Sequence, residues 1–191
     1  MRGGRLRVVA GTAGGRRLVA PPHARPTTER TREAIFDALG ARVVDATVLD
    51  LYAGSGALAI EALSRGAARA RLVEPDRRAL DAIAANLAAT GFADQARVDA
   101  TTVARLLDAG APPEAPFDLV LADPPYDAAA GELARVLARL VDPGWLAADA
   151  RVVLETARRD SPPAPGAGLE VRSSRRYGDT LVTTLGPAPG P

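Results

Sequence analysis

Four apolar runs that each end in an acidic residue constrain the fold of this chain more than any other feature. The runs read as buried strands, because they are short and almost wholly apolar. Segments with apolar residues at helical spacing separate them, as in Leu80, Ile83 and Leu87. Strands that alternate with helices form a parallel sheet, and ligands bind at the carboxyl ends of its strands. The sequence therefore predicts an α/β fold with four carboxylates at strand ends: Asp50, Glu74, Asp99 and Asp123.

A glycine-rich turn follows the first of these strands. Gly54 and Gly56 allow a tight turn whose backbone can approach a ligand closely. A helix is expected to begin at about Ala57 and to stop at Gly66. Ala59 stands where the dinucleotide-binding fingerprint has its third glycine, which is an accepted variant. This strand–turn–helix unit indicates a nucleotide-binding loop without identifying the nucleotide.

The second strand places its acid at a distance typical of nucleotide sites. Glu74 comes 18 residues after Gly56, close to the spacing at which a Rossmann-like fold presents a carboxylate to ribose hydroxyls. Asp76 is suited to cap the next helix, which we expect to close at Gly91. One acid at a strand end is commonplace as a helix cap or a solvated loop residue. Acids at the ends of four successive strands are a stronger indication of a ligand-binding site.

The fourth strand ends in Asp123-Pro124-Pro125-Tyr126. Two prolines cannot continue a strand ladder, because proline has no N–H and a fixed φ. The chain must leave the sheet there with an acid, a free carbonyl and an aromatic ring on one side. Such a set is suited to hold a planar base by its amino group. The alternative is an ordinary strand end with a solvated aspartate and a packing tyrosine.

Further segments, taken with these motifs, match a known family. They are residues 7–11, 15–18, 25–36 and 177–180, which include Arg-Pro-Thr-Thr, Arg-Glu-Ala-Ile-Phe and Tyr-Gly-Asp-Thr. With Asp50-Leu-Tyr-Ala-Gly-Ser-Gly and Asp123-Pro-Pro-Tyr, they resemble the bacterial 16S ribosomal RNA guanine-N2 methyltransferases of the RsmD type. The resemblance covers roughly residues 5–186. Thr31 stands where that family usually has valine, a departure outside the motifs of the proposed chemistry.

The resemblance implies a reaction, a cofactor and a site. S-adenosylmethionine would donate a methyl group to the exocyclic N2 of a guanine in 16S ribosomal RNA. Asp123 and the Pro124 carbonyl would accept the two amine N–H bonds, and Tyr126 would stack on the base. Asp50 would support the glycine loop, Glu74 would hold the ribose hydroxyls, and Asp99 the adenine amino group. The implied cofactor-binding residues are Asp50, Tyr52, Ala53, Gly54, Ser55, Gly56, Glu74, Pro75, Asp99, Ala100 and Asp123.

It also implies the organisation of the chain. We expect a Rossmann-like class I methyltransferase fold, with a mostly parallel seven-stranded sheet and a C-terminal antiparallel hairpin. Residues 1–40 would form an RNA-binding extension of a β-hairpin around residues 13–15 and a helix over 28–39. Residues 41–186 would form the catalytic domain, with a helix over 128–140 capped by Asp127, a strand over 151–155 and a closing hairpin of strands over 169–174 and 180–185. Residues 187–191 would be a frayed tail.

The charge of the chain is unevenly distributed. Residues 1–36 hold eight arginines and two glutamates, whereas residues 37–150 hold ten arginines and 17 acidic residues. A basic extension on an acidic body is a plausible phosphate-binding surface, and arginine both pairs with phosphate and stacks on bases. An arginine-rich solvated surface is the plainer interpretation. The implied RNA-contacting residues are Arg7, Arg16, Arg17, Arg25, Thr27, Arg30 and Tyr126.

Composition excludes several other classes of protein. The chain has no cysteine and one histidine, which excludes disulfides, thiol catalysis and most zinc sites, so no metal is expected. It has no long apolar run and no apolar leader, so we expect a cytoplasmic protein. We also expect a monomer. Three alternatives stay open: a DNA adenine-N6 or cytosine-N4 methyltransferase, a protein-glutamine N5 methyltransferase, and a non-catalytic nucleotide-binding or RNA-chaperone module.

Overall fold

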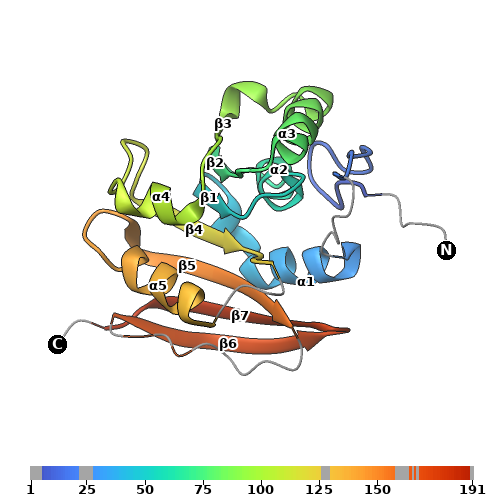
Figure 1. Cartoon of the computed structure of the whole chain (residues 1–191). Helices are drawn as coiled ribbons and strands as arrows, with labels where there is room; N and C mark the ends of the chain where they lie inside the picture. Colours follow the sequence, from blue (N-terminus) through green and yellow to red (C-terminus); the bar gives the residue numbers. More distant parts are fainter. Residues whose placement is uncertain are drawn as a thin grey trace.

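The computed structural model describes residues 6–21, 28–125, 130–157, 164, 166 and 168–189. Seven strands form one sheet in the order β3-β2-β1-β4-β5-β7-β6, which runs from β3 at the top of Figure 1 to β6 at the bottom. The first five strands in sequence pair in parallel, and β7 pairs antiparallel with both β5 and β6. The predicted class, a mostly parallel seven-stranded sheet with a C-terminal antiparallel hairpin, is confirmed. The strands are β1 (Thr47–Leu51), β2 (Arg69–Val73), β3 (Ala96–Asp99), β4 (Phe117–Ala122), β5 (Leu146–Ala157), β6 (Leu169–Tyr177) and β7 (Thr180–Pro187).

The helices begin where the sequence provides caps. Thr28, Asp76 and Thr102 each accept backbone N–H groups of the first turn of α1, α3 and α4. Gly91 ends α3 in the left-handed conformation that favours glycine. The expected cap Asp127 lies outside the described residues. The helices are α1 (Glu29–Leu39), α2 (Ala57–Ser64), α3 (Arg77–Thr90), α4 (Val103–Asp108) and α5 (Ala130–Leu140), with short 3-10 turns at Gly40–Val43 and Ala93–Gln95.

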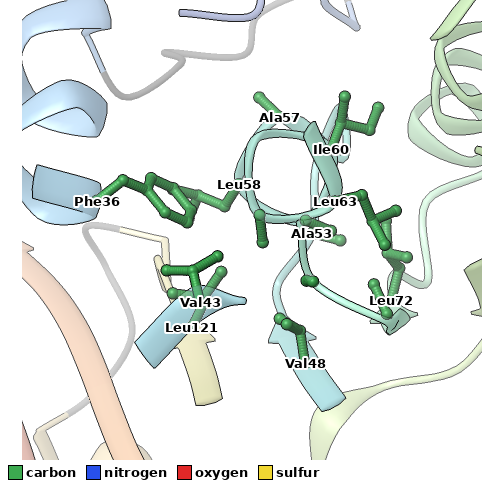
Figure 2. Packing of buried hydrophobic residues seen from close by; sticks show 14 of the residues in the cluster. Phe36, Val43, Val48, Ala53, Ala57, Leu58, Ile60, Leu63, Leu72 and Leu121 are labelled. Carbon is green, nitrogen blue, oxygen red and sulfur yellow. The ribbon is translucent and has the colours of Figure 1, made fainter. Parts of the chain in front are cut away.

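Alternate residues of the central strands face two separate hydrophobic clusters. Val48 of β1 lies in one cluster with residues of α1, α2 and α3, whereas Leu49 and Leu51 lie in the other with residues of α4 and α5. Figure 2 shows Leu58 of α2 directed toward Phe36 of α1, with Val48 beneath the helix. Asp50 has the same parity as Val48, so its side chain lies on the α2 face of the sheet.

The N-terminal extension is part of this core. Leu6, Val8, Ala13 and Leu18 are buried in the same cluster as Phe36 and the α2 residues. The expected hairpin is only partly formed. Arg7 and Arg17 make one isolated antiparallel bridge, and the segment between them is held by a few backbone hydrogen bonds, such as those between Val8 and residues 15–16, instead of a continuous ladder. Glycines and small residues at positions 10–15 leave few side chains to sustain a longer ladder. We call residues 6–21 the arm.

Two other elements differ from the sequence-based expectation. β5 is 12 residues long, because it begins at Leu146, beside Phe117, well before the apolar run over 151–155. The strands of the closing hairpin also extend further than the sequence suggested, since β6 pairs with β7 from Leu169 to Tyr177. No helix among the described residues is long and apolar enough to cross a membrane.

Candidate active site

The carboxyl ends of four parallel strands lie level at one edge of the sheet. The register pairs Leu51 with both Val73 and Ala122, and Val73 with Asp99. The residues that follow β1, β2 and β4 therefore emerge side by side. Strand order reverses between β1 and β4, and such a switch point is where open α/β sheets bind ligands. The structure brings Asp50, Glu74 and Asp123 to this region, as the sequence predicts.

The loop after β1 has an unusual backbone. Tyr52 has a φ of 65°, and Gly54 and Gly56 have φ of 58° and 76°. A left-handed conformation at an aromatic residue is strained, and such strain is found mostly at functional sites. Gly56 has little room for a side chain, since an added Cβ would lie 3.1 Å from a methyl carbon of Leu72. Gly56 is therefore required where the loop packs against the core side chains of Leu72 and Ile83.

The side chain of Tyr52 reaches across to α5. Its hydroxyl donates a hydrogen bond to Oε1 of Glu132 at 3.3 Å. Burial, together with the neighbouring Glu132 carboxylate, raises the pKa of the Tyr52 phenol to about 12. The tyrosine therefore stays protonated and connects the glycine loop with the helix that follows the Asp-Pro-Pro-Tyr segment.

Asp50 is a buried carboxylate with an incomplete set of partners. It is 1% exposed, and its Oδ2 accepts the N–H of Ala59 at 3.1 Å. This bond supplies the first turn of α2, whose N-cap Gly56 has no side chain to do so. Oδ1 has no hydrogen-bond partner among the described residues. Burial raises the pKa of Asp50 to about 8, and the charges of Asp123 and Glu74 add to this rise.

Glu74 joins the glycine loop to the start of α3. Its Oε2 accepts the N–H of Gly54 at 2.9 Å, and its Oε1 accepts the N–H of Asp76 at 2.8 Å. Asp76 caps α3 itself, by accepting from Arg78 and Ala79. Glu74 is therefore more than a helix cap. Each of its oxygens retains a lone pair that could accept a further hydrogen bond.

Asp99 lies in a different environment at the end of β3. Its Oδ2 accepts from Nε of Arg71 at 2.5 Å, and its Oδ1 lies 3.8 Å from Nε of Arg97. Arg71 is itself buried and also pairs with Glu114 at 2.6 Å. The carboxylate predicted to hold an adenine amino group is thus already engaged by arginines. Pro75 and Ala100, which follow β2 and β3, are exposed at the same edge.

Asp123 and Pro124 directly follow β4 and are half-buried. The negative charge of Asp123 contributes to the raised pKa of Asp50, which shows that the two carboxylates are close enough to interact. Tyr126 lies outside the described residues. Among those residues, no group of three or more histidines, aspartates or glutamates could hold a metal ion.

The predicted RNA-contacting arginines lie on the surface of the arm and α1. Arg7, Arg16, Arg17 and Arg30 are exposed, whereas Arg25 and Thr27 lie outside the described residues. Arg7 pairs with Glu29 at 3.0 Å, and Nη1 of Arg16 donates to the carbonyl of Ala89 at 2.9 Å. These contacts fix two of the guanidinium groups without burying them.

Sequence reasoning missed the buried polar residues that hold the arm. Arg32, Glu61, Ser64 and Asn86 are each at most 1% exposed, and each contacts the arm backbone. Their signal in the sequence is a polar residue at an apolar-facing helical position, such as Asn86 between Ile83 and Leu87. A polar group buried this deeply must be paired, which makes such positions worth a search for partners.

Comparison with known proteins agrees with this architecture. The family described as Conserved hypothetical protein 95 matches residues 6–186. The chain is 36% identical over 177 residues to Ribosomal RNA small subunit methyltransferase D of Escherichia coli K12, a match that covers 92% of this chain and 86% of that protein. It is 34% identical over 180 residues to the putative rRNA methyltransferase YlbH of Bacillus subtilis, which covers 93% and 96% of the two chains.

The fold agrees as well. A solved structure described as the putative methyltransferase yhhF from Escherichia coli superposes with a TM-score of 0.85 at 35% identity, over 96% of this chain and 98% of that one. Both the sequence and the structure match along nearly the whole chain. The resemblance predicted from the motifs is thereby confirmed, and the chain belongs to the family of the ribosomal RNA small subunit methyltransferases D.

Proposed function

We propose that this protein transfers a methyl group from S-adenosylmethionine to the exocyclic N2 of a guanine in 16S ribosomal RNA. The observation that best supports it is the position of Asp123-Pro124, directly beyond β4 and beside the glycine loop of β1 at the switch point of the sheet. Family membership supports small-subunit ribosomal RNA as the substrate, because the Escherichia coli relative is named a ribosomal RNA small subunit methyltransferase and the Bacillus subtilis relative a putative rRNA methyltransferase.

The residues at the ends of β1 and β2 suit a cationic nucleoside. Asp50 has a buried oxygen, Oδ1, that no group of the described residues hydrogen-bonds, and Glu74 has lone pairs left beside the loop. Gly54 has open space where a side chain would stand, with only the Tyr52 carbonyl within 4 Å of an added Cβ. The donor, when bound, supplies an electrophilic methyl group on a positively charged sulfur. Ser55, Gly56 and Ala53 complete the proposed cofactor loop, with Pro75 and Ala100 at its rim.

Asp123 and Pro124 would act on the nucleophile. The exocyclic nitrogen of guanine is weakly nucleophilic, because its lone pair is delocalised into the ring. Accepting both of its N–H bonds, one at the Asp123 carboxylate and one at the Pro124 carbonyl, favours a pyramidal nitrogen aligned for in-line displacement. The carboxylate also stabilises the positive charge that develops on that nitrogen. In this proposal Tyr126 stacks on the flipped base, a contact of about 1–3 kcal/mol.

The exposed arginines of the arm would contact the RNA backbone. Removing the arm to test this would also remove Leu6, Val8 and Leu18 from the core, so charge variants are the better test. Arg16→Gln and Arg17→Gln should each weaken RNA binding and lower the slope of log affinity against log salt by about 1. Arg105→Gln, at an exposed position in α4, is a matched control that should change neither. An unchanged salt slope in both arm variants would remove the arm from the RNA surface.

The experiment that tests the function is methylation of defined substrates. Purified protein and methyl-labelled S-adenosylmethionine are incubated with 16S RNA, with immature small subunits, with duplex DNA and with a glutamine-containing release-factor protein. Digestion and mass spectrometry should find N2-methylguanosine in one of the two RNA substrates, and Asp123→Ala should abolish it. N6-methyladenosine or N4-methylcytosine in DNA, or N5-methylglutamine in protein, would identify an alternative class of enzyme instead.

The proposal also covers the state of the RNA substrate, the oligomeric state of the protein and its location. The two RNA substrates separate action on free RNA from action on a partly assembled subunit. We propose a monomer, which light scattering of the purified protein can test. We also propose a cytoplasmic location, because the substrate is assembled there.

A further inference from the structure

The arm is held by its backbone. Two buried side chains of α2 bind it: Glu61 accepts the N–H groups of Val9 at 2.7 Å and Ala10 at 3.0 Å, and Ser64 accepts the N–H of Ala13 at 2.9 Å. Gly11 lies so close to α2 that an added Cβ would stand 1.8 Å from the Ser64 carbonyl oxygen. These contacts fix residues 9–13 directly against the catalytic core.

The end of the arm is held differently, by one residue of α3. Oδ1 of Asn86 accepts the N–H of Val19 at 2.7 Å, and Nδ2 donates to the carbonyl of Val19 at 2.9 Å. The side chain of Val19 is 57% exposed, so burial of that side chain contributes little to its placement. Together with the buried side chain of Leu18, the two hydrogen bonds to Asn86 therefore hold the chain where it leaves the core before Pro21.

The same amide also holds the glycine loop. The second N–H of Asn86 Nδ2 donates to the carbonyl of Ser55 at 2.9 Å. Ser55 lies between Gly54, whose N–H is bound by Glu74, and Gly56, which begins α2. Rotating the amide by 180° would set its oxygen against two carbonyls, so only the observed orientation satisfies all three partners. Asn86 is 1% exposed, and water cannot readily replace these bonds.

We infer that Asn86 is a positioning residue that couples the arm to the cofactor loop. The inference rests on the proposed function, in which the loop contacts S-adenosylmethionine and the arm contacts RNA. A ligand that orders Ser55 fixes the amide, and the amide fixes Val19. Because coupling between two sites is reciprocal, RNA held by the arm should tighten cofactor binding by the same factor that the cofactor tightens RNA binding.

Hydrogen exchange tests this coupling without turnover. S-adenosylhomocysteine, added to the wild-type protein, should slow amide exchange in residues 16–20 as well as in the glycine loop. The amide of Val19 is the most direct reporter, since its N–H donates to Oδ1 of Asn86 at 2.7 Å. Protection confined to residues 50–60 and 73–76 would show that the loop and the arm respond independently, which would overturn the inference.

Two variants of Asn86 sharpen the test. Asn86→Ala removes all three hydrogen bonds, and Asn86→Asp retains the acceptor for Val19 N–H but loses both donors. Each should abolish the ligand-dependent protection of residues 16–20 and weaken S-adenosylhomocysteine about two- to tenfold, the range for one lost hydrogen bond. In turnover, the KM for S-adenosylmethionine should rise more than kcat falls.

Thr90→Val is the matched control. Thr90 lies one turn further along α3 and is buried, and its hydroxyl donates to the helix carbonyls of Asn86 and Leu87 and to no other group of the described residues. It should lower stability without changing the ligand-dependent protection of the arm. A loss of protection in Thr90→Val equal to that in Asn86→Ala would assign the effect to helix stability and contradict a positioning role.

The outcomes separate this inference from the proposed function. Wild-type protein that does not bind S-adenosylhomocysteine at all would refute the cofactor assignment. Wild-type protein that binds it without protecting the arm refutes only the coupling. If Asn86→Ala does not fold, the wild-type exchange experiment and Asn86→Asp still decide the question.

Discussion

The two halves of the acidic sheet edge differ in how their carboxylates are compensated. At β1 and β2, Asp50 and Glu74 accept backbone N–H groups, and no arginine among the described residues pairs with either. At β3, Asp99 is bound by Arg71 at 2.5 Å, and Arg97 lies beside it. Acids that look equivalent in the sequence thus differ in the structure: Asp50 and Glu74 have no arginine partner among the described residues, whereas Asp99 beside them is paired with one.

The difference indicates which acids are available to a ligand. Burying carboxylates without a cation is unfavourable, and the raised pKa of Asp50 reflects that cost. A positively charged ligand at the ends of β1 and β4 would relieve it. Asp99 already has its cation, in an ion-pair network with Arg71 and Glu114 that fixes the strand end. We therefore expect the largest functional effects at Asp123, Glu74 and Asp50, and the smallest at Asp99.

The largest expected effect is on catalysis at Asp123. Asp123→Ala should reduce methyl transfer by about two to three powers of ten, the usual effect of losing one preorganised electrostatic group. Asp123→Asn should be milder, since an amide oxygen still accepts the hydrogen bond of the amine. Single-turnover assays separate this chemical step from RNA binding. Near wild-type rates in Asp123→Ala would make this acid a structural residue at the end of β4.

The next effect concerns cofactor affinity at Glu74. Glu74→Ala should weaken S-adenosylhomocysteine roughly ten- to a hundredfold, because charge-assisted hydrogen bonds of about 1.5–3 kcal/mol are lost. The substitution also frees the N–H of Gly54, so loop order and ribose contact are lost together. Glu74→Gln keeps the bond from Gly54, since its amide oxygen can still accept there, but it loses the bond from Asp76 and the negative charge that strengthens the ribose contact. Calorimetry that shows unchanged affinity in both variants would remove Glu74 from the cofactor site.

A pH dependence of stability is expected from Asp50. Its pKa is raised to about 8 in the folded protein, so the folded state keeps a proton that the unfolded state has already released. Stability should therefore fall as the pH rises from the unfolded pKa of the carboxyl group toward 8. Asp50→Asn removes this titration. Relative to wild type, its free energy of unfolding should rise by about 2–3 kcal/mol between about pH 6 and pH 8.

The ionisation of Asp50 should also affect the affinity for the cofactor. A sulfonium cation favours ionised Asp50, so S-adenosylmethionine should bind more tightly as the pH rises from about 6 to about 8. S-adenosylhomocysteine, which lacks the sulfonium charge, should show a weaker dependence, and Asp50→Asn should flatten both profiles. Equal pH dependence for the two ligands in wild-type protein would show that Asp50 does not respond to the charge of the ligand.

Much of this fold follows from local patterns in the sequence. The buried runs and their acids predicted β1 to β4, and Thr28, Asp76 and Gly91 marked helix ends close to where the structure has them. The length of β5 could not be predicted, because its first half is only partly apolar and is held by pairing with Phe117. Such pairing depends on tertiary contacts rather than on the local pattern.

The site was predicted in position but not in detail. Spacing brought Asp50, Glu74 and Asp123 to one edge, since strand ends in a parallel sheet converge. Sequence could not distinguish Asp99 from the others, because its partner Arg71 lies on a neighbouring strand 28 residues away. Nor could it identify Asn86, whose three partners lie 31 and 67 residues away in the chain. The arginine that pairs with an acid and the segments that one buried amide joins are set by contacts between residues far apart in the sequence.

The smallest expected effect is on cofactor affinity at Asp99. Asp99→Asn should weaken S-adenosylhomocysteine less than about threefold, because the Asp99 carboxylate is already engaged by Arg71 and Arg97. The same variant should lower the free energy of unfolding by about 1.5–3 kcal/mol, since Arg71 loses a charged partner while it stays buried. Calorimetry and chemical denaturation on the same preparation measure both quantities. The sequence predicted that Asp99 holds the adenine amino group, and an affinity loss as large as that of Glu74→Ala would support that assignment. Such a result would show that an arginine-paired acid can still bind the cofactor, and it would break the division between the two halves of the edge.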